Sequence, residues 1–518
     1  MPCTRESARA FKAPANLQFR KRFLSPIATF LMVSTSLPLL FSGIANAQNQ
    51  NDPRDLLLNA RENILDTIKR LPRYLCTQVV DRTRYEPVDR EEGLVSDRRT
   101  RPCDDTVAAA RRADRKRRLV SSDRLRLDVA VGQSVPGMES EMYSWAGENR
   151  FGDQDLIEFV HDGAVSTGSF SAMLAAIFGN NVTKFSYSGD SKISGRLLSE
   201  FGFRIGQEES SYKYVYGKEN NQETPMAYDG TIFVDPETAD LVRLVIRTAQ
   251  LRPETGACEL SQTLDYGRVR LNDADFLLPK QALVAAIHSD ATESENRIQY
   301  SACREFRSKS VLRFPASNAE ETKVSDTSAP ATPQFALPPG LPFSVLLTDP
   351  IDTAKAAAGD PVRGKLKTSI RDSSKNILVP EGASVAGRIM SIKRYYDRPE
   401  ASDSQSEKRD PGWGTILIGG QPFPTSESRN KRRRKPSLVL KIRLETLDFG
   451  GSPHPLNVAF DSGRRRFRKD NGEPSQRVDI GSLDPSQDST TASFEFWDTS
   501  PDYVVNSGLE SSWVTLAK

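Results

Sequence analysis

Residues whose types and spacing could support catalysis are sparse in this 518-residue chain. A Ser-x-x-Lys spacing occurs at Ser210-Ser-Tyr-Lys213, the pattern in which a lysine activates a serine nucleophile in serine acyl-enzymes. Those enzymes place the motif at the start of a helix. Here it falls inside an alternating, strand-like run, where residues three apart face opposite sides. We interpret it as a chance match, and the sequence holds no Gly-x-Ser-x-Gly, Walker or His-Glu-x-x-His motif.

The three histidines, His161, His288 and His454, are far apart in the sequence and show no metal-ligand spacing. Only His161 has a functional context, because it precedes a Gly-, Ser- and Thr-rich stretch that contains Ser166 and Ser169. A hydrolase would need these side chains to converge with a carboxylate. A loop histidine bonded to backbone is the simpler interpretation. The sequence therefore predicts no catalytic residue, no metal and no cofactor, with an envelope hydrolase kept as the third alternative.

The cysteines indicate disulfide chemistry. Apart from Cys3, the chain has an even set: Cys76, Cys103, Cys258 and Cys303. Four cysteines in an oxidising compartment suggest two disulfides, with three pairings open. Sequence proximity favours Cys76–Cys103 and Cys258–Cys303, and free buried thiols are the alternative. The absence of CxxC spacing disfavours redox catalysis and zinc.

A candidate ligand site lies in an apolar segment between residues 156 and 178. Two apolar pieces flank the Gly-, Ser- and Thr-rich stretch, and the second is typical of a short helix ended by Gly179. We expect this segment to cover the open face of a curved sheet as a lid over an apolar ligand. The residues predicted to line the site are Leu156, Phe159, Phe170, Leu174 and Phe178.

The elements that must position this lid are mostly strands. Asp52-Pro53 is typical of a helix start, and apolar residues spaced three and four apart from Leu57 to Leu71 predict a helix with one buried face, ended by Pro72. Alternating runs then predict one large antiparallel sheet. These runs are 74–85, 124–131, 201–205, 212–216, 231–234, 241–249, 261–271, 276–287 and 298–306.

A second β-rich region follows a change in composition. Strand-like runs occur at 343–347, 361–370, 377–380, 384–392, 438–447 and 456–460. The predicted class is mainly β, with α+β character in the first domain: a curved antiparallel sheet with an N-terminal helix and a short lid helix, then a linker and a β-barrel or sandwich domain. The predicted divisions are a first domain at 48–314, a disordered Ala/Ser/Thr/Pro linker at 315–338 and a second domain at 339–518 with a disordered insertion at about 397–436.

The first 47 residues are typical of a secretory signal peptide. A basic patch precedes an apolar run at residues 27–41, and Ala45-Asn46-Ala47 supplies a cleavage pattern. The run is short for a membrane helix, and an uncleaved anchor is the alternative. We therefore expect an exported protein, in the periplasm or outside the cell and associated with the envelope. No later stretch of 18 or more apolar residues predicts a transmembrane span.

Removing the signal segment changes the charge of the chain. Residues 1–47 contain six Lys or Arg and one Glu, so the formal net charge falls from +3 to about −2 without them. This argues against nucleic acid as a partner. Basic runs remain at 111–118, 431–435 and 464–469. We interpret them as solvated loops balanced by nearby Asp and Glu, with anionic lipid headgroups or acidic polymers as the alternative.

Residues 53–314 resemble an exported acidobacterial-type protein family of unknown function and the periplasmic lipoprotein-carrier fold. The motifs that carry this are Leu71-Pro-Arg-Tyr-Leu-Cys-Thr-Gln78, Ser144-Trp-Ala-Gly147, Ser166-Thr-Gly-Ser-Phe170, Phe233-Val-Asp-Pro236, Leu264-Asp-Tyr-Gly267, Phe276-Leu-Leu-Pro279 and Cys303-Arg-Glu-Phe306. The resemblance implies a curved antiparallel sheet closed by a helical lid over an apolar cavity.

Residues 337–518 resemble the TrbI-type β domain of conjugative-transfer and envelope proteins. The motifs are Leu337-Pro-Pro-Gly340, Ala358-Gly-Asp360, Leu378-Val-Pro-Glu-Gly382-Ala-Ser-Val385-Ala-Gly387 and Gly508-Leu-Glu-Ser-Ser-Trp513. This resemblance implies a module for contacts with an envelope partner. The leading hypothesis is a non-enzymatic envelope protein that binds a lipid, a lipoprotein or another apolar ligand in its first domain. A structural or scaffolding protein without a ligand is the main alternative.

Overall fold

The structure is a computed structural model. It describes residues 52–88, 102–112, 114–135, 138–148, 151, 156–159, 170–216, 222–248, 251, 255–306, 337–399, 434–461 and 490–517. The predicted signal segment, most of the predicted linker and most of the predicted insertion lie outside these residues. No helix among the described residues is both long and apolar enough to cross a membrane.

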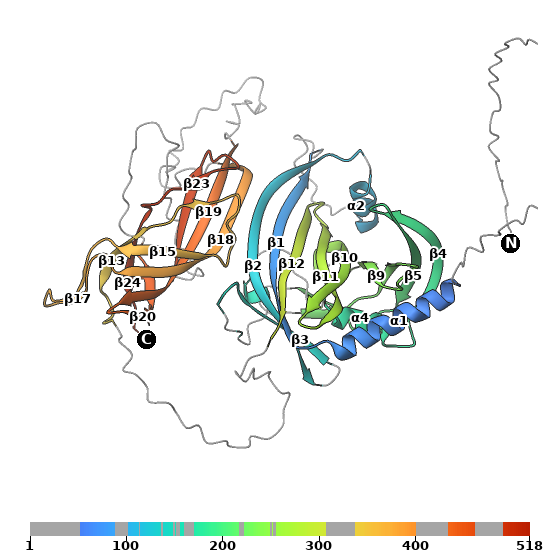
Figure 1. Cartoon of the computed structure of the whole chain (residues 1–518). Helices are drawn as coiled ribbons and strands as arrows, with labels where there is room; N and C mark the ends of the chain where they lie inside the picture. Colours follow the sequence, from blue (N-terminus) through green and yellow to red (C-terminus); the bar gives the residue numbers. More distant parts are fainter. Residues whose placement is uncertain are drawn as a thin grey trace, which may run out of the picture. The chain divides into compact units, whose positions relative to one another are not determined.

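One antiparallel sheet forms the first part of the molecule, and Figure 1 shows it as a curved layer. In order across the sheet, its strands are β4 (Lys184–Ile193), β5 (Arg196–Ile205), β8 (Tyr228–Val234), β9 (Leu241–Thr248), β10 (Ala257–Leu271), β11 (Ala274–His288), β12 (Glu293–Glu305), β1 (Tyr74–Pro87), β2 (Arg117–Val135) and β3 (Met138–Trp145). A separate hairpin pairs β6 (Lys213–Tyr216) with β7 (Gln222–Pro225).

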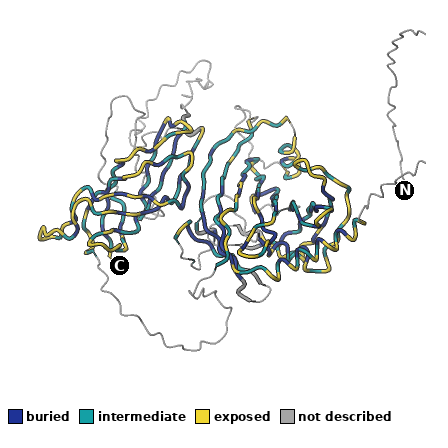
Figure 2. The backbone as a smooth tube through the Cα atoms, in the orientation of Figure 1, coloured by how far each residue is buried: buried dark blue, intermediate teal, exposed yellow. Residues whose placement is uncertain are grey.

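Alternation along the strands separates the two faces of this sheet. On β2, Leu125, Leu127 and Val129 are buried in the core, while the side chains of Arg124 and Arg126 form ion pairs. Figure 2 shows how buried positions recur along the strands. The apolar residues share one face because successive side chains on a strand point to opposite sides. That face, called the concave face below, carries the core of the sheet.

Helix α1 (Pro53–Arg70) confirms the predicted N-terminal helix. Asp52 caps it by accepting a hydrogen bond from the backbone N–H of Arg54 at 2.9 Å, and Pro53 occupies a position where its missing N–H costs nothing. The residues it buries recur at helical spacing: Leu56, Ala60, Ile64 and Thr67. α1 lies beside α4 (Ala172–Phe178) at one end of the sheet (Figure 1).

A second set of strands has its own core. The paired order is β22 (Thr491–Trp497), β19 (Arg434–Phe449), β18 (Ser384–Pro399), β15 (Pro361–Leu366), β13 (Pro342–Leu347), β24 (Glu510–Thr515) and β21 (Val458–Phe460). Shorter pairs are β19 with β20 (Ser452–Pro455), β14 (Ile351–Asp352) with β23 (Val504–Val505), and β16 (Ile370–Arg371) with β17 (Ile377–Val379). Trp513, Phe494 and Phe496 are fully buried in this core. The mainly β class is confirmed, and in the described residues the sheet is not closed into a barrel.

The outer edge of β2 joins the two sets of strands. β3 pairs with the second half of β2, and residues 121–123 of β2 pair with residues 393–395 of β18. Between them, Ala358 exchanges backbone hydrogen bonds with Arg124 and Arg126 at 2.8 and 2.7 Å. Arg126 also forms an ion pair with Asp360. The edge of β2 is therefore covered from residue 121 to residue 135, which protects it from pairing with another chain.

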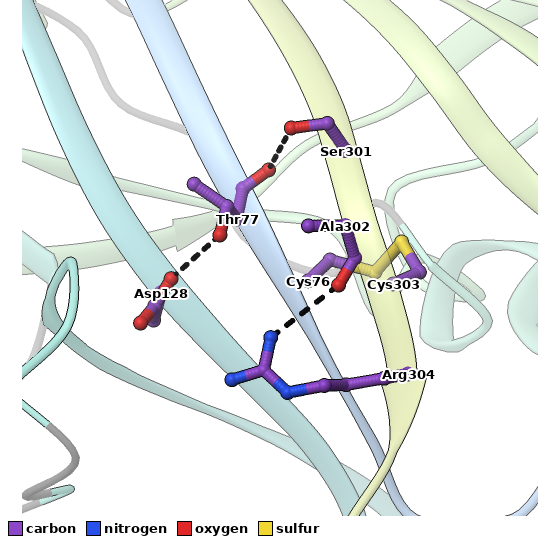
Figure 3. The surroundings of a disulfide bond; sticks show 7 residues. All are labelled: Cys76, Thr77, Asp128, Ser301, Ala302, Cys303 and Arg304. Atoms are coloured by element: carbon purple, nitrogen blue, oxygen red, sulfur yellow. Dashed lines mark hydrogen bonds between the residues drawn. A yellow bond between two sulfur atoms is a disulfide. The ribbon is translucent and has the colours of Figure 1, made fainter.

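Both disulfides differ from the pairing that sequence proximity favoured. Cys76 is bonded to Cys303, and Cys103 to Cys258. The first pair follows from the sheet order, because β1 and β12 are neighbours and a β-bulge brings the two cysteines opposite each other (Figure 3). The second pair ties the short helix α2 (Cys103–Ala110) to the start of β10. The predicted pairing is wrong because the contacts of β1 and α2 are with strands far along the chain.

Candidate ligand site beneath the lid

The structure brings the five predicted lining residues into one hydrophobic cluster. Leu156 lies on the short helix α3 (Leu156–Phe159), and Leu174 and Phe178 lie on α4. Leu156, Phe170, Leu174 and Phe178 are buried in the core of the first sheet, and Phe159 packs against that core. The described parts of segment 156–178, called the lid below, thus place these five side chains in or against the core. Their role in ligand binding stays a prediction.

Aromatic contacts fix the lid on the concave face. The ring of Phe170 meets Tyr74 of β1 edge-on with centroids 5.6 Å apart, and Tyr300 of β12 at 5.1 Å. Phe159 meets Trp145 of β3 edge-on at 5.1 Å. Edge-to-face ring pairs at these distances stabilise the packing beyond what the burial of their apolar surface contributes. Two separate pieces of the lid are therefore seated on the sheet through aromatic rings.

Arg61 of α1 holds the C-terminal end of α4. Its Nε donates to the carbonyl oxygen of Phe178 at 2.8 Å, and its Nη2 donates to the side-chain oxygen of Asn181 at 3.1 Å. Asn180 donates to the carbonyl oxygen of Ala176 at 2.6 Å. The last carbonyls of a helix have no partners within the helix, so these side chains satisfy them. A cation at this end also complements the helix dipole.

One small cavity lies beside α4. A cavity of about 10 Å³ lies between α1, α4 and β11. Its lining includes Phe170 and Leu174, with Ile64, Ile68 and Leu278 opposite. A void of this size holds about one water molecule. The apolar side chains of the sheet and the lid therefore fill this part of the concave face themselves.

Polar groups also face this core, and the sequence reading missed them. On β3 the hydroxyl of Tyr143 donates to Oε2 of Glu141 at 2.5 Å. Burial, and then Glu141, raises the pKa of Tyr143 well above its usual value. Burial also raises the pKa of Tyr266 on β10, with Tyr300 and Glu141 contributing. Glu141 and Tyr266 lie on strands far apart in the sheet order, so curvature brings them together. The available sequence signal was Glu141, Tyr143 and Trp145 at alternate positions of one strand.

The other residues considered for catalysis do not form a site in the described structure. Ser210 lies in the turn before β6, not inside a strand as predicted, and its hydroxyl bonds to the backbone of Tyr212. His161, Ser166 and Ser169 lie outside the described residues. Among the residues that the structure places, no group of His, Cys, Asp or Glu could hold a metal ion.

The basic run at 111–118 is paired with carboxylates. Arg111 pairs with Glu259, Arg115 and Arg117 with Glu293, and Arg118 with Glu86. Carboxylates balance these arginines, as the sequence suggested, but the predicted solvated loop is wrong for Arg117 and Arg118, which begin β2. The runs at 431–435 and 464–469 lie almost entirely outside the described residues.

Comparison with known proteins gives likeness to solved structures only. No family model and no curated protein matches the chain. The chain is similar to a putative outer membrane lipoprotein-sorting protein domain from Vibrio parahaemolyticus, with 10% identity, a TM-score of 0.23, and coverage of 51% of this chain and 95% of that one. It is also similar to a DUF1329 family protein from Desulfovibrio piger, with 8% identity, a TM-score of 0.21, and 48% and 92% coverage.

A LolA superfamily protein from Nitrosomonas europaea is similar at 8% identity, with a TM-score of 0.19 and coverage of 49% of this chain and 93% of that one. These neighbours do not bear on the TrbI-type resemblance. The proposals below rest on the contacts of this chain.

Proposed function

We propose that the first sheet is a non-enzymatic carrier for a long-chain amphiphile, whose apolar chain takes the place of the lid on the concave face. The observation that carries this proposal is α4, whose buried residues are all apolar: Met173, Leu174, Ile177 and Phe178. Outside its apolar contacts, α4 is held by the bonds of Arg61 at its C-terminal end, so the proposal treats it as a removable cover.

Free energies of burial decide which ligand could displace this cover. Burying four large apolar side chains is worth about 6–12 kcal/mol, and burying fifteen methylene groups is worth about 12 kcal/mol. A chain of about sixteen carbons therefore reaches the upper end of the range for the α4 contacts, whereas a chain of eight carbons, at about 6 kcal/mol, reaches only its lower end. The small cavity agrees with this view, because a ligand must replace the lid and not simply enter a preformed space.

Native mass spectrometry of the full chain, purified without detergent, tests the proposal. We expect a bound lipid, or uptake of a sixteen-carbon probe with much weaker uptake of its eight-carbon analogue. Phe170→Ala, which removes a lid anchor, should increase uptake. Leu58→Ala is the matched control, because Leu58 is 56% exposed on α1. Protein that is lipid-free and takes up neither probe would rule the carrier out.

A structural role without a ligand is the second candidate, and the close packing between α1, α4 and β11 favours it. In that case the second set of strands would contact an envelope partner. Cross-linking in intact cells followed by purification tests this role. Recovery of the same partner with ligand-free protein would favour a scaffold over a carrier.

Both roles require export to the envelope, and two disulfides favour export, because such bonds persist in oxidising compartments. Cell fractionation with alkylation of free thiols checks it. Protein found in the cytoplasm with reduced cysteines would exclude this location.

A further inference from the structure

A group of aromatic side chains and one carboxylate gathers beneath the lid. Its members come from β1, β3, β10 and β12, and we call it the aromatic–carboxylate cluster. They are Tyr74, Glu141, Tyr143, Trp145, Tyr266 and Tyr300. β3 supplies Glu141, Tyr143 and Trp145 at alternate positions, so all three face the same side of the strand.

The cluster is enclosed by the lid. Tyr143, Trp145 and Tyr266 are buried, and Glu141 is half-buried. Phe159 covers Trp145, and Phe170 lies against Tyr74 and Tyr300. Removal of the lid would take away these two rings and leave the cluster facing the vacated space. The proposed ligand would then meet its rings and its carboxylate.

The chemistry of the cluster favours one kind of head group. Aromatic faces attract cations, and quaternary ammonium groups are recognised by aromatic cages of this composition. The phenols stay neutral, because burial raises the pKa of both Tyr143 and Tyr266. Glu141, which accepts the hydrogen bond from Tyr143, is the acidic side chain of the cluster. An anionic head group would meet this carboxylate and be disfavoured.

We propose that the ligand of this site carries an alkylammonium head group, which binds the aromatic–carboxylate cluster in the place of Phe159 and Phe170. The inference rests on the proposed carrier function and names the chemical class of its ligand. The aromatic rings provide the faces for the cation, and the carboxylate of Glu141 provides charge complementarity.

Three probes of equal chain length test this on the full chain: hexadecyltrimethylammonium, hexadecanoate and hexadecanol, each below its micelle concentration. Fluorescence of Trp145 reports occupancy, with Trp145→Phe as the control for signal from the other tryptophans. We expect the ammonium probe to bind about tenfold more tightly than hexadecanol. Hexadecanoate should bind most weakly.

Glu141→Gln keeps the shape of the side chain and removes its charge. We expect it to weaken ammonium binding about tenfold and to leave hexadecanol binding unchanged. Glu148→Gln, in the turn after β3, is the matched control and should keep the wild-type ranking. Thermal unfolding checks that each variant is folded, and the ranking of the probes on the wild-type protein needs no variant.

Equal binding of all three probes, or a preference for hexadecanoate, would overturn the head-group assignment and leave the carrier function standing. A wild-type ranking that survives Glu141→Gln would also overturn it. Failure of every probe to bind folded protein would remove the carrier function and the head-group assignment together.

Discussion

Single side chains decide how firmly the lid is closed, and Arg61 is the clearest case. Its guanidinium donates to the carbonyl of Phe178 and to Asn181, so it ties the end of α4 to α1. We expect Arg61→Ala to lower the free energy of unfolding by about 1–3 kcal/mol, because hydrogen bonds from a charged donor are lost. Hydrogen exchange of the α4 amides should accelerate.

The control for this change is Arg54→Ala, which removes an exposed arginine from the same helix. Arg61→Lys should give an intermediate rate, because the ammonium keeps the charge without the fork of donors. Unchanged exchange in α4 after Arg61→Ala would show that apolar packing alone closes the lid.

His288, at the end of β11, should make stability depend on pH. Burial lowers its pKa, Arg84 lowers it further, and Asp290 and a bond to the backbone of Gly256 oppose this. Because the folded pKa is below the unfolded value, the unfolded chain takes up the proton first as pH falls. The stabilisation is present above about pH 6.5 and is lost as pH falls through the folded pKa.

Urea unfolding at pH 7.5, 6.5 and 5.5 measures this dependence. For the wild type we expect His288 to lower the free energy of unfolding by at most about 1.4 kcal/mol for each unit that the pH falls. His288→Gln should remove this part of the pH dependence. Ser294→Ala breaks the 3.2 Å contact with Nε2 of His288 but keeps the imidazole, so it should retain the dependence. Equal slopes for the wild type and His288→Gln would contradict the assignment.

At the scale of elements, the two disulfides join parts of the chain that are 227 and 155 residues apart in sequence. Cys76–Cys303 links two strands that are already paired, whereas Cys103–Cys258 links the short helix α2 to β10. We expect the double change Cys103→Ser and Cys258→Ser to lower the free energy of unfolding by about 2–5 kcal/mol. It should also detach α2 from β10 without loosening the rest of the sheet. Cys76→Ser with Cys303→Ser should cost a similar amount without such a local effect.

Mass spectrometry of an unreduced digest checks the pairing directly. It should yield the linked peptides 76–303 and 103–258. Recovery of a 76–103 link would support the pairing by sequence proximity and contradict the structure.

Local patterns predicted much of the fold. The helical spacing from Leu57 to Leu71 predicted α1, alternation predicted most strands, and the apolar segment predicted the buried lid. The elements that these patterns missed include β3, β4, β7, β20, β22, β24 and α2. The disulfide partners were wrong because the pairing of β1 with β12 is a long-range contact that local alternation does not encode. The convergence of Glu141 with Tyr266 was missed for a related reason, since it needs the curvature of the whole sheet.

At the scale of the whole molecule, the covered edge of β2 links the stability of the two cores. Arg388, which is 7% exposed, donates to the carbonyl of Gly359 at 2.7 Å and to that of Ala146 at 3.4 Å. The backbone of Ala358 bonds to that of β2, and Asp360 pairs with Arg126. Unfolding of either core would break these buried polar contacts, so we expect one cooperative transition for residues 52–517.

Gly359 tests this coupling, because its backbone has a φ of +103° and an added Cβ would lie 2.2 Å from the carbonyl oxygen of Arg126. Gly382 has a φ of +82° with open space around it. Gly382→Ala should therefore lower the free energy of unfolding only by the conformational penalty of a positive φ, about 1–2 kcal/mol. Gly359→Ala should lower the free energy of unfolding by about 1–3 kcal/mol more, because the backbone of β2 must move.

Calorimetry measures whether the two cores still unfold together. It should show two transitions for Gly359→Ala and one for Gly382→Ala. A single transition with equal losses in both variants would mean that the edge of β2 does not couple the cores.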